Sequence, residues 1–189
     1  MIKDVWYNVL LNSHIDDFKN LCFVNKLTVD ICNDKHFWSE KFAKDNLWLP
    51  ESFIKNMVKV YKNISYYKIK SIKIIKDVDN ASIQMIEHHL IPFRIFKHFP
   101  TEIVNQFLMN KDIEYNNQFY LVLEIDKVLN QFNISYQMLK KNHDKYSNES
   151  YNIITVKITY DELILYLVKL LYWDPHLALY VIGKNHIRH

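Results

Sequence analysis

The sequence predicts an α+β fold: an N-terminal three-helix module, then a mainly helical segment, then a small antiparallel sheet of about three strands packed by a C-terminal apolar helix. Two observations predict it. Apolar residues recur every three or four positions through most of the first 110 residues, which is the period of a helix. Gln118–Ile125 is enriched in strand formers, and in Tyr151–Thr159 apolar residues alternate with polar ones, as in strands.

The first 48 residues are expected to form three helices. Asp16 is placed to cap the second helix, which is apolar on two sides and so needs to be covered on both. The third helix is expected from about Asp30 to a point near Leu47. The first helix has an apolar face made of Val5, Val9 and Leu10.

The following segment is expected to be mainly helical. Pro50 suits the first turn of a helix, and Tyr66–Lys76 is ambiguous between helix and strand. Asn80–Leu90 is expected to be a helix that stops before Pro92. A short helix is expected to start at Pro100.

Three strands are expected at Gln118–Ile125, Ile134–Lys140 and Tyr151–Thr159, the last with the clearest alternation. Thr159 and Glu162 have the spacing of a capping box, which opens a very apolar helix through Trp173. A last short helix is expected from Asp174 and Pro175, closed by Gly183, the only glycine.

The sequence offers little that could carry catalysis. A single glycine excludes the phosphate-cradling loops, which need glycines for close backbone approach. Cys22 falls on an apolar stripe, where a nucleophilic thiolate is disfavoured. The two dense histidine groups, His88–His89 and His186–His189, are expected to lie on the surface. We therefore expect no enzyme, no catalytic residue, no metal site and no cofactor.

Cys22 and Cys32 are ten residues apart and form no C-x-x-C motif. They are expected to be reduced, buried residues of an intracellular protein. The N-terminus lacks the apolar run of a signal peptide. The most apolar segment, Leu163–Trp173, is too short to cross a bilayer and contains Lys169. A soluble protein without a membrane partner is expected.

The charge balance is nearly even, with 24 basic and 21 acidic residues and a net charge of +3. Lys, Asn, Ile and Tyr abound, whereas arginine occurs twice. Codons rich in A and T encode the abundant set, so we attribute the skew to the genome. Nucleic-acid binding is not the leading expectation, because such proteins favour arginine for bidentate contacts.

Apolar and polar residues from Asp4 to Trp38 follow one family's order without a gap. Asp4–Val5 match its opening, Val9–Leu10 its apolar pair, and Asp17–Phe18 its Asp-Leu pair. Leu21, Val24 and Lys26 match its middle, and Ile31, Asp34, Phe37 and Trp38 match its end. Residues 1–48 thus resemble an F-box, the three-helix module that binds the Skp adaptor of cullin ubiquitin ligases. The sequence departs from the family at Ile2, where the family has Pro, and at Thr28, where it often has Trp.

The resemblance implies a function without chemistry of its own. Residues 1–48 would bind an Skp-type adaptor, and residues 49–189, an α+β domain, would hold an unknown target protein for ubiquitin transfer. The adaptor contacts carried over are Val5, Val9, Leu10, Ile15, Leu21 and Val24. The core or rim positions are Phe18, Ile31, Phe37 and Trp38. Together with the codon skew, the segment is similar to proteins of large DNA viruses, which implies the host cytoplasm.

Two other functions remain open from the sequence. The apolar helices could make a structural or assembly protein that forms homo-oligomers. The Lys-rich segment from Tyr66 to Lys76 could make a nucleic-acid-associated protein, with salt-dependent binding as its mark.

Overall fold

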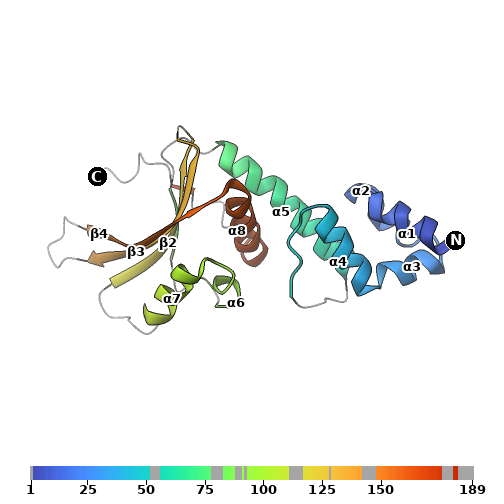
Figure 1. The fold of residues 1–189 in the computed structure, drawn as a ribbon, viewed down its shortest axis with the longest axis horizontal. Helices are drawn as coiled ribbons and strands as arrows, with labels where there is room; N and C mark the ends of the chain where they lie inside the picture. Colours follow the sequence, from blue (N-terminus) through green and yellow to red (C-terminus); the bar gives the residue numbers. More distant parts are fainter. Residues whose placement is uncertain are drawn as a thin grey trace. The chain divides into compact units, whose positions relative to one another are not determined.

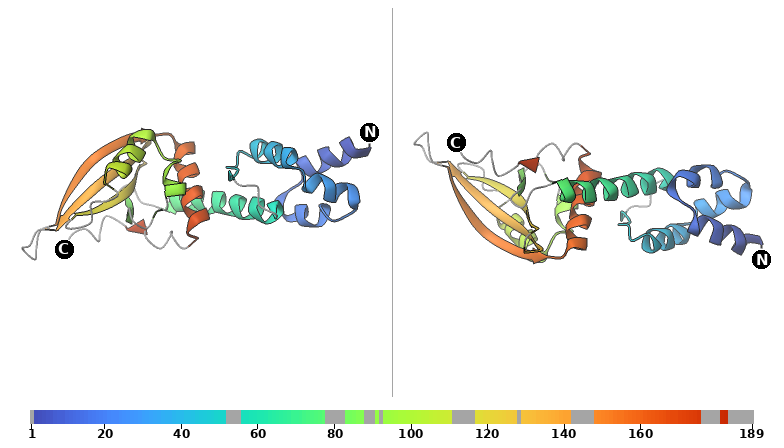
Figure 2. Two further views of the ribbon diagram at one scale, coloured as in Figure 1. Left: turned by 90° about the horizontal axis from the view of Figure 1, so that it is seen from below. Right: turned by 90° about the horizontal axis from the view of Figure 1, so that it is seen from above.

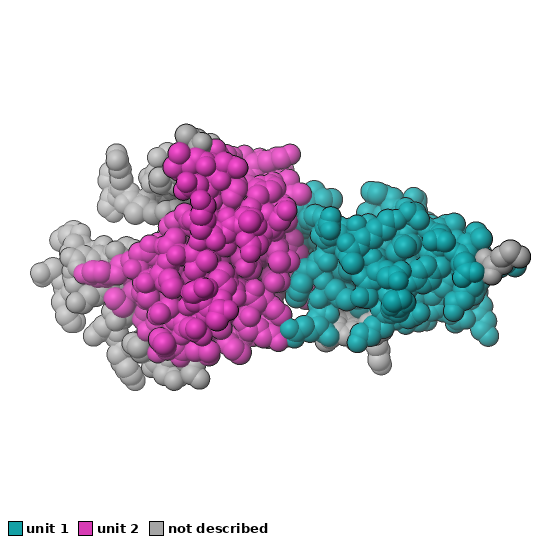
Figure 3. Space-filling view, viewed as in Figure 1, with its two compact units in different colours: residues 1–70 teal, residues 71–189 magenta. Residues whose placement is uncertain are grey.

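The computed structural model is α+β, as the sequence predicts (Figure 1). It describes residues 2–51, 56–77, 83–87, 91, 93–110, 117–127, 129–141, 148–175 and 181–182. The chain divides into two compact units, Met1–Lys70 and Ser71–His189 (Figure 3). The first unit therefore extends beyond Trp48, where the sequence suggested a boundary.

Unit 1 is helical. Four helices precede residue 48 where three were expected, because the second expected helix breaks after Leu21. Asn25 starts a new helix there through a capping box: its side-chain oxygen accepts the Thr28 N–H at 2.9 Å, and the Thr28 hydroxyl accepts the Asn25 N–H at 3.1 Å. The helices are α1 (Ile2–Asn12), α2 (Ile15–Leu21), α3 (Lys26–Cys32), α4 (Lys35–Lys44) and α5 (Met57–Asp77).

Two helix ends in unit 1 have features that the sequence did not predict. The cap of α2 is His14, not Asp16, which lies in the first turn where the helix dipole favours a carboxylate. At the end of α4, Asn46 adopts a left-handed backbone with φ of 50°. Its N–H donates to the Ala43 carbonyl at 3.1 Å and the Leu47 N–H donates to the Phe42 carbonyl at 2.8 Å, which is a Schellman motif.

The core of unit 1 is aromatic. Trp38 is at its centre, fully buried, and its indole N–H donates to the Cys32 carbonyl at 2.7 Å. Tyr61, from the first turns of α5, packs against this cluster, so the segment after residue 56 is part of the same compact unit. The ring centroids of Phe18, Phe37, Phe42 and Tyr61 all lie within 6.2 Å of the Trp38 centroid.

The segment that was ambiguous between helix and strand, Tyr66–Lys76, is helical: it forms the second half of α5. The helix begins at Met57, where Asn56 accepts the Lys59 N–H at 3.1 Å, so Pro50 does not open it. The boundary between the two units, after Lys70, falls inside α5.

Unit 2 contains an antiparallel sheet of strand order β4-β3-β2-β1-β5. The three long strands are those expected from the sequence, and two short strands extend the sheet beyond β2. The strands are β1 (Ile83–Glu87), β2 (Asn117–Asp126), β3 (Gln131–Lys141), β4 (Asn148–Ile158) and β5 (Val181–Ile182).

The expected helix at Asn80–Leu90 is wrong where the structure describes it. Ile83–Glu87 pairs with β2 along its whole length, and Ile86 lies opposite Leu121 with both side chains buried. The expected last helix is also wrong at Val181–Ile182, which pairs with β1. Gly183 and the two histidine groups lie outside the described residues.

Three helices of unit 2 gather on one face of the sheet (Figure 2). They are α6 (Phe93–Phe96), α7 (Thr101–Asn110) and α8 (Tyr160–Trp173). The expected capping box of α8 is confirmed: Thr159 donates its N–H to the Glu162 carboxylate at 2.7 Å and accepts the Glu162 N–H at 3.2 Å. Within the part of the chain described, no helix has the length and apolar character to cross a membrane.

Candidate functional site

The outer side of α1 is apolar and exposed. Ile2, Val5 and Val9 expose 74%, 60% and 41% of their surface. At about 100° per residue, these three positions fall within an arc of roughly 60° on the helix, so they form one stripe. We call Ile2, Val5 and Val9 the α1 stripe.

The opposite side of α1 is anchored to α4. The Tyr7 hydroxyl donates to the Glu40 carboxylate at 3.0 Å, and the Tyr7 ring meets Phe37 edge-on with centroids 5.3 Å apart. Burial, and then the hydrogen bond to Glu40, raise the pKa of Tyr7 to about 12. The hydroxyl therefore remains a proton donor at neutral pH.

A buried lysine fixes the C-terminal end of α1. The Lys41 side chain is 2% exposed, and its ammonium donates to the carbonyls of Leu11 and Ser13, both at 3.0 Å. The same ammonium pairs with Asp45 at 3.0 Å and lies over the rings of Phe18 and Tyr61. Three acceptors satisfy its three N–H groups, so this charge orients α1.

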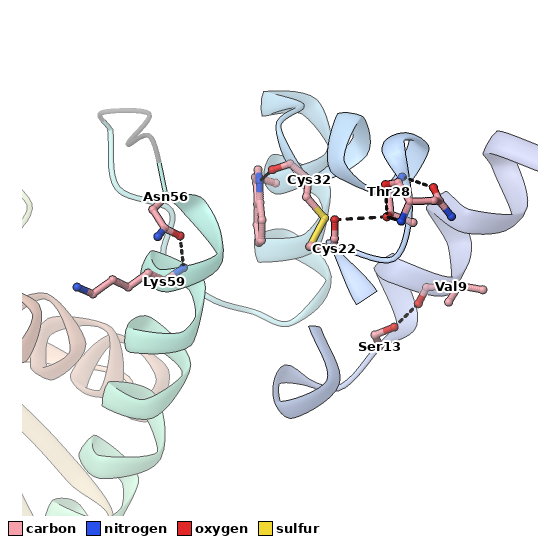
Figure 4. The surroundings of a disulfide bond; sticks show 9 residues. Val9, Ser13, Cys22, Thr28, Cys32, Asn56 and Lys59 are labelled. Carbon is pink, nitrogen blue, oxygen red and sulfur yellow. Dashed lines mark hydrogen bonds between the residues drawn. A yellow bond between two sulfur atoms is a disulfide. The ribbon is translucent and has the colours of Figure 1, made fainter. Parts of the chain in front are cut away.

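A second exposed apolar element is the turn between α2 and α3, where Phe23 and Val24 both point largely into solvent. A disulfide between Cys22 and Cys32 closes the segment that contains the turn, with Cα atoms 5.8 Å apart (Figure 4). The Thr28 hydroxyl also donates to the Cys22 carbonyl at 3.3 Å. The turn is thus held by a covalent bond and by the cap of α3.

The disulfide corrects the expectation of two reduced cysteines. Both are buried, as expected, but they are bonded to each other. Disulfides persist in oxidising surroundings, so the cysteines no longer support the expected cytoplasmic location.

The structure separates the residues that the resemblance assigned to adaptor contact. Val5, Val9 and Val24 are exposed, and Ile15 and Leu21 are half-exposed. Leu10 is a correction: it has no exposed surface, because it points about 100° away from Val9 into the core, and it cannot contact a partner. The positions assigned to core or rim are all core: Phe18, Ile31, Phe37 and Trp38.

Ile2 and Phe23 were missed as exposed apolar residues. Ile2 was noted only as a departure from the family pattern, although its position three residues before Val5 places it on the same helical face. Phe23 follows Cys22 in the segment where the second helix was expected to continue, and the break after Leu21 leaves it in a turn instead.

A hollow of about 370 Å³ lies in unit 1 beside the end of α1. The lysines that line this hollow donate hydrogen bonds to neighbouring backbone groups and side chains. Lys68 donates to the carbonyls of Asp45 and Asn46, both at 3.1 Å, and Lys44 donates to the Asn12 side chain. These cations offset the negative ends of α1 and α4, which is a structural role. Among the described residues, no cluster of His, Cys, Asp or Glu could hold a metal ion.

The chain was compared with family models, with curated proteins and with solved structures, and none of them matches. The resemblance to an F-box stays a prediction from the sequence.

Proposed function

We propose that the protein is a non-catalytic adaptor whose N-terminal helices dock an Skp-type protein of a cullin ubiquitin ligase, while the second unit holds a target protein. The α1 stripe is the observation that carries this proposal. It presents three apolar side chains to solvent on a helix whose other side is fixed by Tyr7 and Lys41.

A fixed apolar stripe suits a binding surface better than a mobile one. Ordering a helix at the moment of binding costs free energy, and α1 is already ordered by its contacts with α4. The exposed turn residues Phe23 and Val24 add apolar surface in the same unit, and the cap of α3 holds the end of this turn. Groups of exposed apolar residues of this kind are typical of protein interaction sites.

The test is co-expression of the full chain with an Skp-type adaptor, followed by size-exclusion chromatography with mass determination. We expect a one-to-one complex. Val5→Glu and Val9→Glu should each weaken it at least about 30-fold, because a buried hot spot cannot accommodate an unpaired charge. Both side chains are exposed in the free protein, so the variants should keep the wild-type circular dichroism spectrum.

Met109→Glu is the matched control. Met109 is 71% exposed in α7 of unit 2, so it receives the same charge on an apolar surface residue that the proposal does not use. Leu10→Glu is not informative, because a charge there would disrupt the core. A folded protein that forms no complex with the adaptor would contradict the proposal.

A second candidate function rests on the same stripe: self-assembly through α1. Concentration-dependent homo-oligomers that dissociate in Val9→Glu, together with no affinity for the adaptor, would favour it over the first.

A further inference from the structure

The hollow of about 370 Å³ beside the end of α1 lies within unit 1. Three parts of this unit line it: the end of α1 with the turn that follows, the end of α4, and the middle of α5. Its volume is at the small end of the range for ligand sites, about 300 to 1,000 Å³. All of these lining residues belong to one compact unit, so a small ligand would need no contact from the other unit.

The hollow has an excess of positive charge. Lys41, Lys44 and Lys68 line it, together with the carboxylate of Asp45. The C-terminal ends of α1 and α4 also lie there, and each carries about half a negative charge. With histidine counted as neutral, three lysines against one carboxylate and two helix ends leave an excess of about one positive charge. This balance favours an anion that carries a single charge.

The structural role of these lysines does not use all of their hydrogen-bond donors. Each ammonium has three N–H groups, and those of Lys41 are satisfied by three acceptors. Among the residues that the structure describes, Lys68 donates to two carbonyls and Lys44 to one side-chain oxygen. One N–H of Lys68 and two of Lys44 are therefore left for solvent or for a ligand in the hollow.

Four aliphatic side chains line the same hollow as the lysines. Leu11, Ile15 and Leu47 are half-exposed, and Ile69 exposes 66% of its surface. They come from three parts of the unit, so a ligand in the hollow would cover apolar surface from each of them. Burial of a methylene group is worth about a fourfold gain in affinity. The lining thus combines cationic donors with apolar surface.

We propose that this hollow binds a small-molecule carboxylate with a short alkyl chain. The carboxylate accepts hydrogen bonds from the remaining N–H groups of Lys44 and Lys68, and the chain contacts the aliphatic side chains. A carboxylate has the single charge that the local balance favours, whereas a phosphate monoester carries closer to two at neutral pH. This binding goes beyond the proposed adaptor function and uses no residue of the α1 stripe.

The experiment is a calorimetric titration of the full chain with sodium octanoate at neutral pH and about 50 mM salt, where screening is weak. We expect saturable one-to-one binding with a Kd below about 1 mM. 1-Octanol has the same chain without the charge and should bind at least about tenfold more weakly. Hexanoate lacks two methylene groups and should bind up to about 15-fold more weakly than octanoate.

The variant Lys44→Gln/Lys68→Gln should weaken octanoate binding at least about tenfold and reduce the preference for octanoate over octanol. The control Lys19→Gln/Lys35→Gln removes the same charge from exposed lysines of α2 and α4 that do not line the hollow, so it should bind octanoate like the wild type.

A second variant does not depend on lysines that also stabilise helix ends. Ile69 is exposed in the free protein, so Ile69→Glu should keep the wild-type circular dichroism spectrum. Its carboxylate would repel the ligand and should weaken octanoate binding at least about tenfold. Val5→Glu is its control, because Val5 is a similarly exposed aliphatic residue of unit 1 outside the hollow.

Three results would overturn the proposal. They are no binding up to about 10 mM octanoate, equal affinities for octanoate and octanol, or equal weakening by a variant and its control. Equal weakening by Ile69→Glu and Val5→Glu would mean that octanoate does not discriminate the hollow from other apolar surface. Formation of the adaptor complex is measured separately by chromatography without octanoate, so failure of one activity does not decide the other.

Discussion

At the residue scale, Lys169 is a buried cation in an apolar helix. It lies in the middle of α8 with 6% of its surface exposed, and its ammonium lies 5.6 Å from the centre of the Tyr166 ring. Burial lowers the pKa of Lys169 from 10.5 to about 8, because the charged form loses its hydration. Lys169 is therefore charged at neutral pH, and burial of this charge lowers the stability of the folded state.

Replacing this lysine should stabilise the protein. Since the pKa of Lys169 is lower in the folded state, the unfolded chain binds more protons between pH 8 and 10.5. Stability from this group therefore rises with pH over that window and is lost as the pH falls through about 8. Lys169→Met should raise the free energy of unfolding by up to about 3 kcal/mol at pH 7.

Urea unfolding of both proteins at pH 7, 8.5 and 10 measures this difference, which should shrink as the pH rises. Burial also raises the pKa of Tyr166, so its ionisation lowers stability above pH 10, and the comparison therefore stops at pH 10. A difference that is independent of pH would show that the charge of Lys169 is not responsible.

Two adjacent residues show what the sequence can predict about the candidate site. The apolar pair Val9 and Leu10 was identifiable from the sequence, and so was its place in a helix. Which of the two faces the core was not, because α1 is apolar on two sides and adjacent side chains diverge by about 100°. Leu10 faces the core because α1 packs against α4, and the residues of α4 lie some 30 positions later in the sequence.

At the element scale, α8 depends on a local signal that the sequence shows directly. Thr159→Ala removes the hydroxyl that accepts the Glu162 N–H, so the free energy of unfolding should fall by about 1 kcal/mol. Thr159→Ser keeps the hydroxyl and should retain most of that stability. Chemical denaturation of the three proteins tests this, and equal loss in both variants would contradict the role of the cap.

The contrast with β1 explains why some elements were predicted and others were not. The strands β2, β3 and β4 are long and rich in β-branched and aromatic residues, so local sequence suffices. In β1, residues that favour helices, such as Gln84, Met85 and Glu87, form a strand because the segment pairs with β2, more than thirty residues away in the sequence. Pairing at that distance leaves no periodic signal.

At the scale of the whole molecule, the disulfide belongs to one unit only. It closes a loop of ten residues in Met1–Lys70, so reduction should lower the stability of that unit by about 3 kcal/mol. Hydrogen exchange followed by mass spectrometry should then show faster exchange in α1 to α4 and unchanged exchange in α8 and β2. Uniform acceleration along the whole chain would contradict the division into two units.

The variant Cys22→Ser/Cys32→Ser is the control, since its exchange should not respond to reductant. The sequence could not predict this bond, because a spacing of ten residues does not determine the distance between two Cα atoms; the turn at Phe23–Asn25 does. The sequence also could not predict where unit 1 ends. The boundary between the units lies within a continuous helix, and no glycine- or proline-rich linker marks it.

The left-handed residue that ends α4 shows how this chain turns sharply with little glycine. Such backbone positions are usually occupied by glycine, which has no Cβ atom to clash with the backbone. In the described part of the chain, Asn46 and Asn130, with φ of 50° and 48°, occupy them. Asparagine tolerates this conformation better than most residues because its short polar side chain can hydrogen-bond locally. A chain with one glycine can therefore still make tight turns by placing asparagine where the backbone must be left-handed.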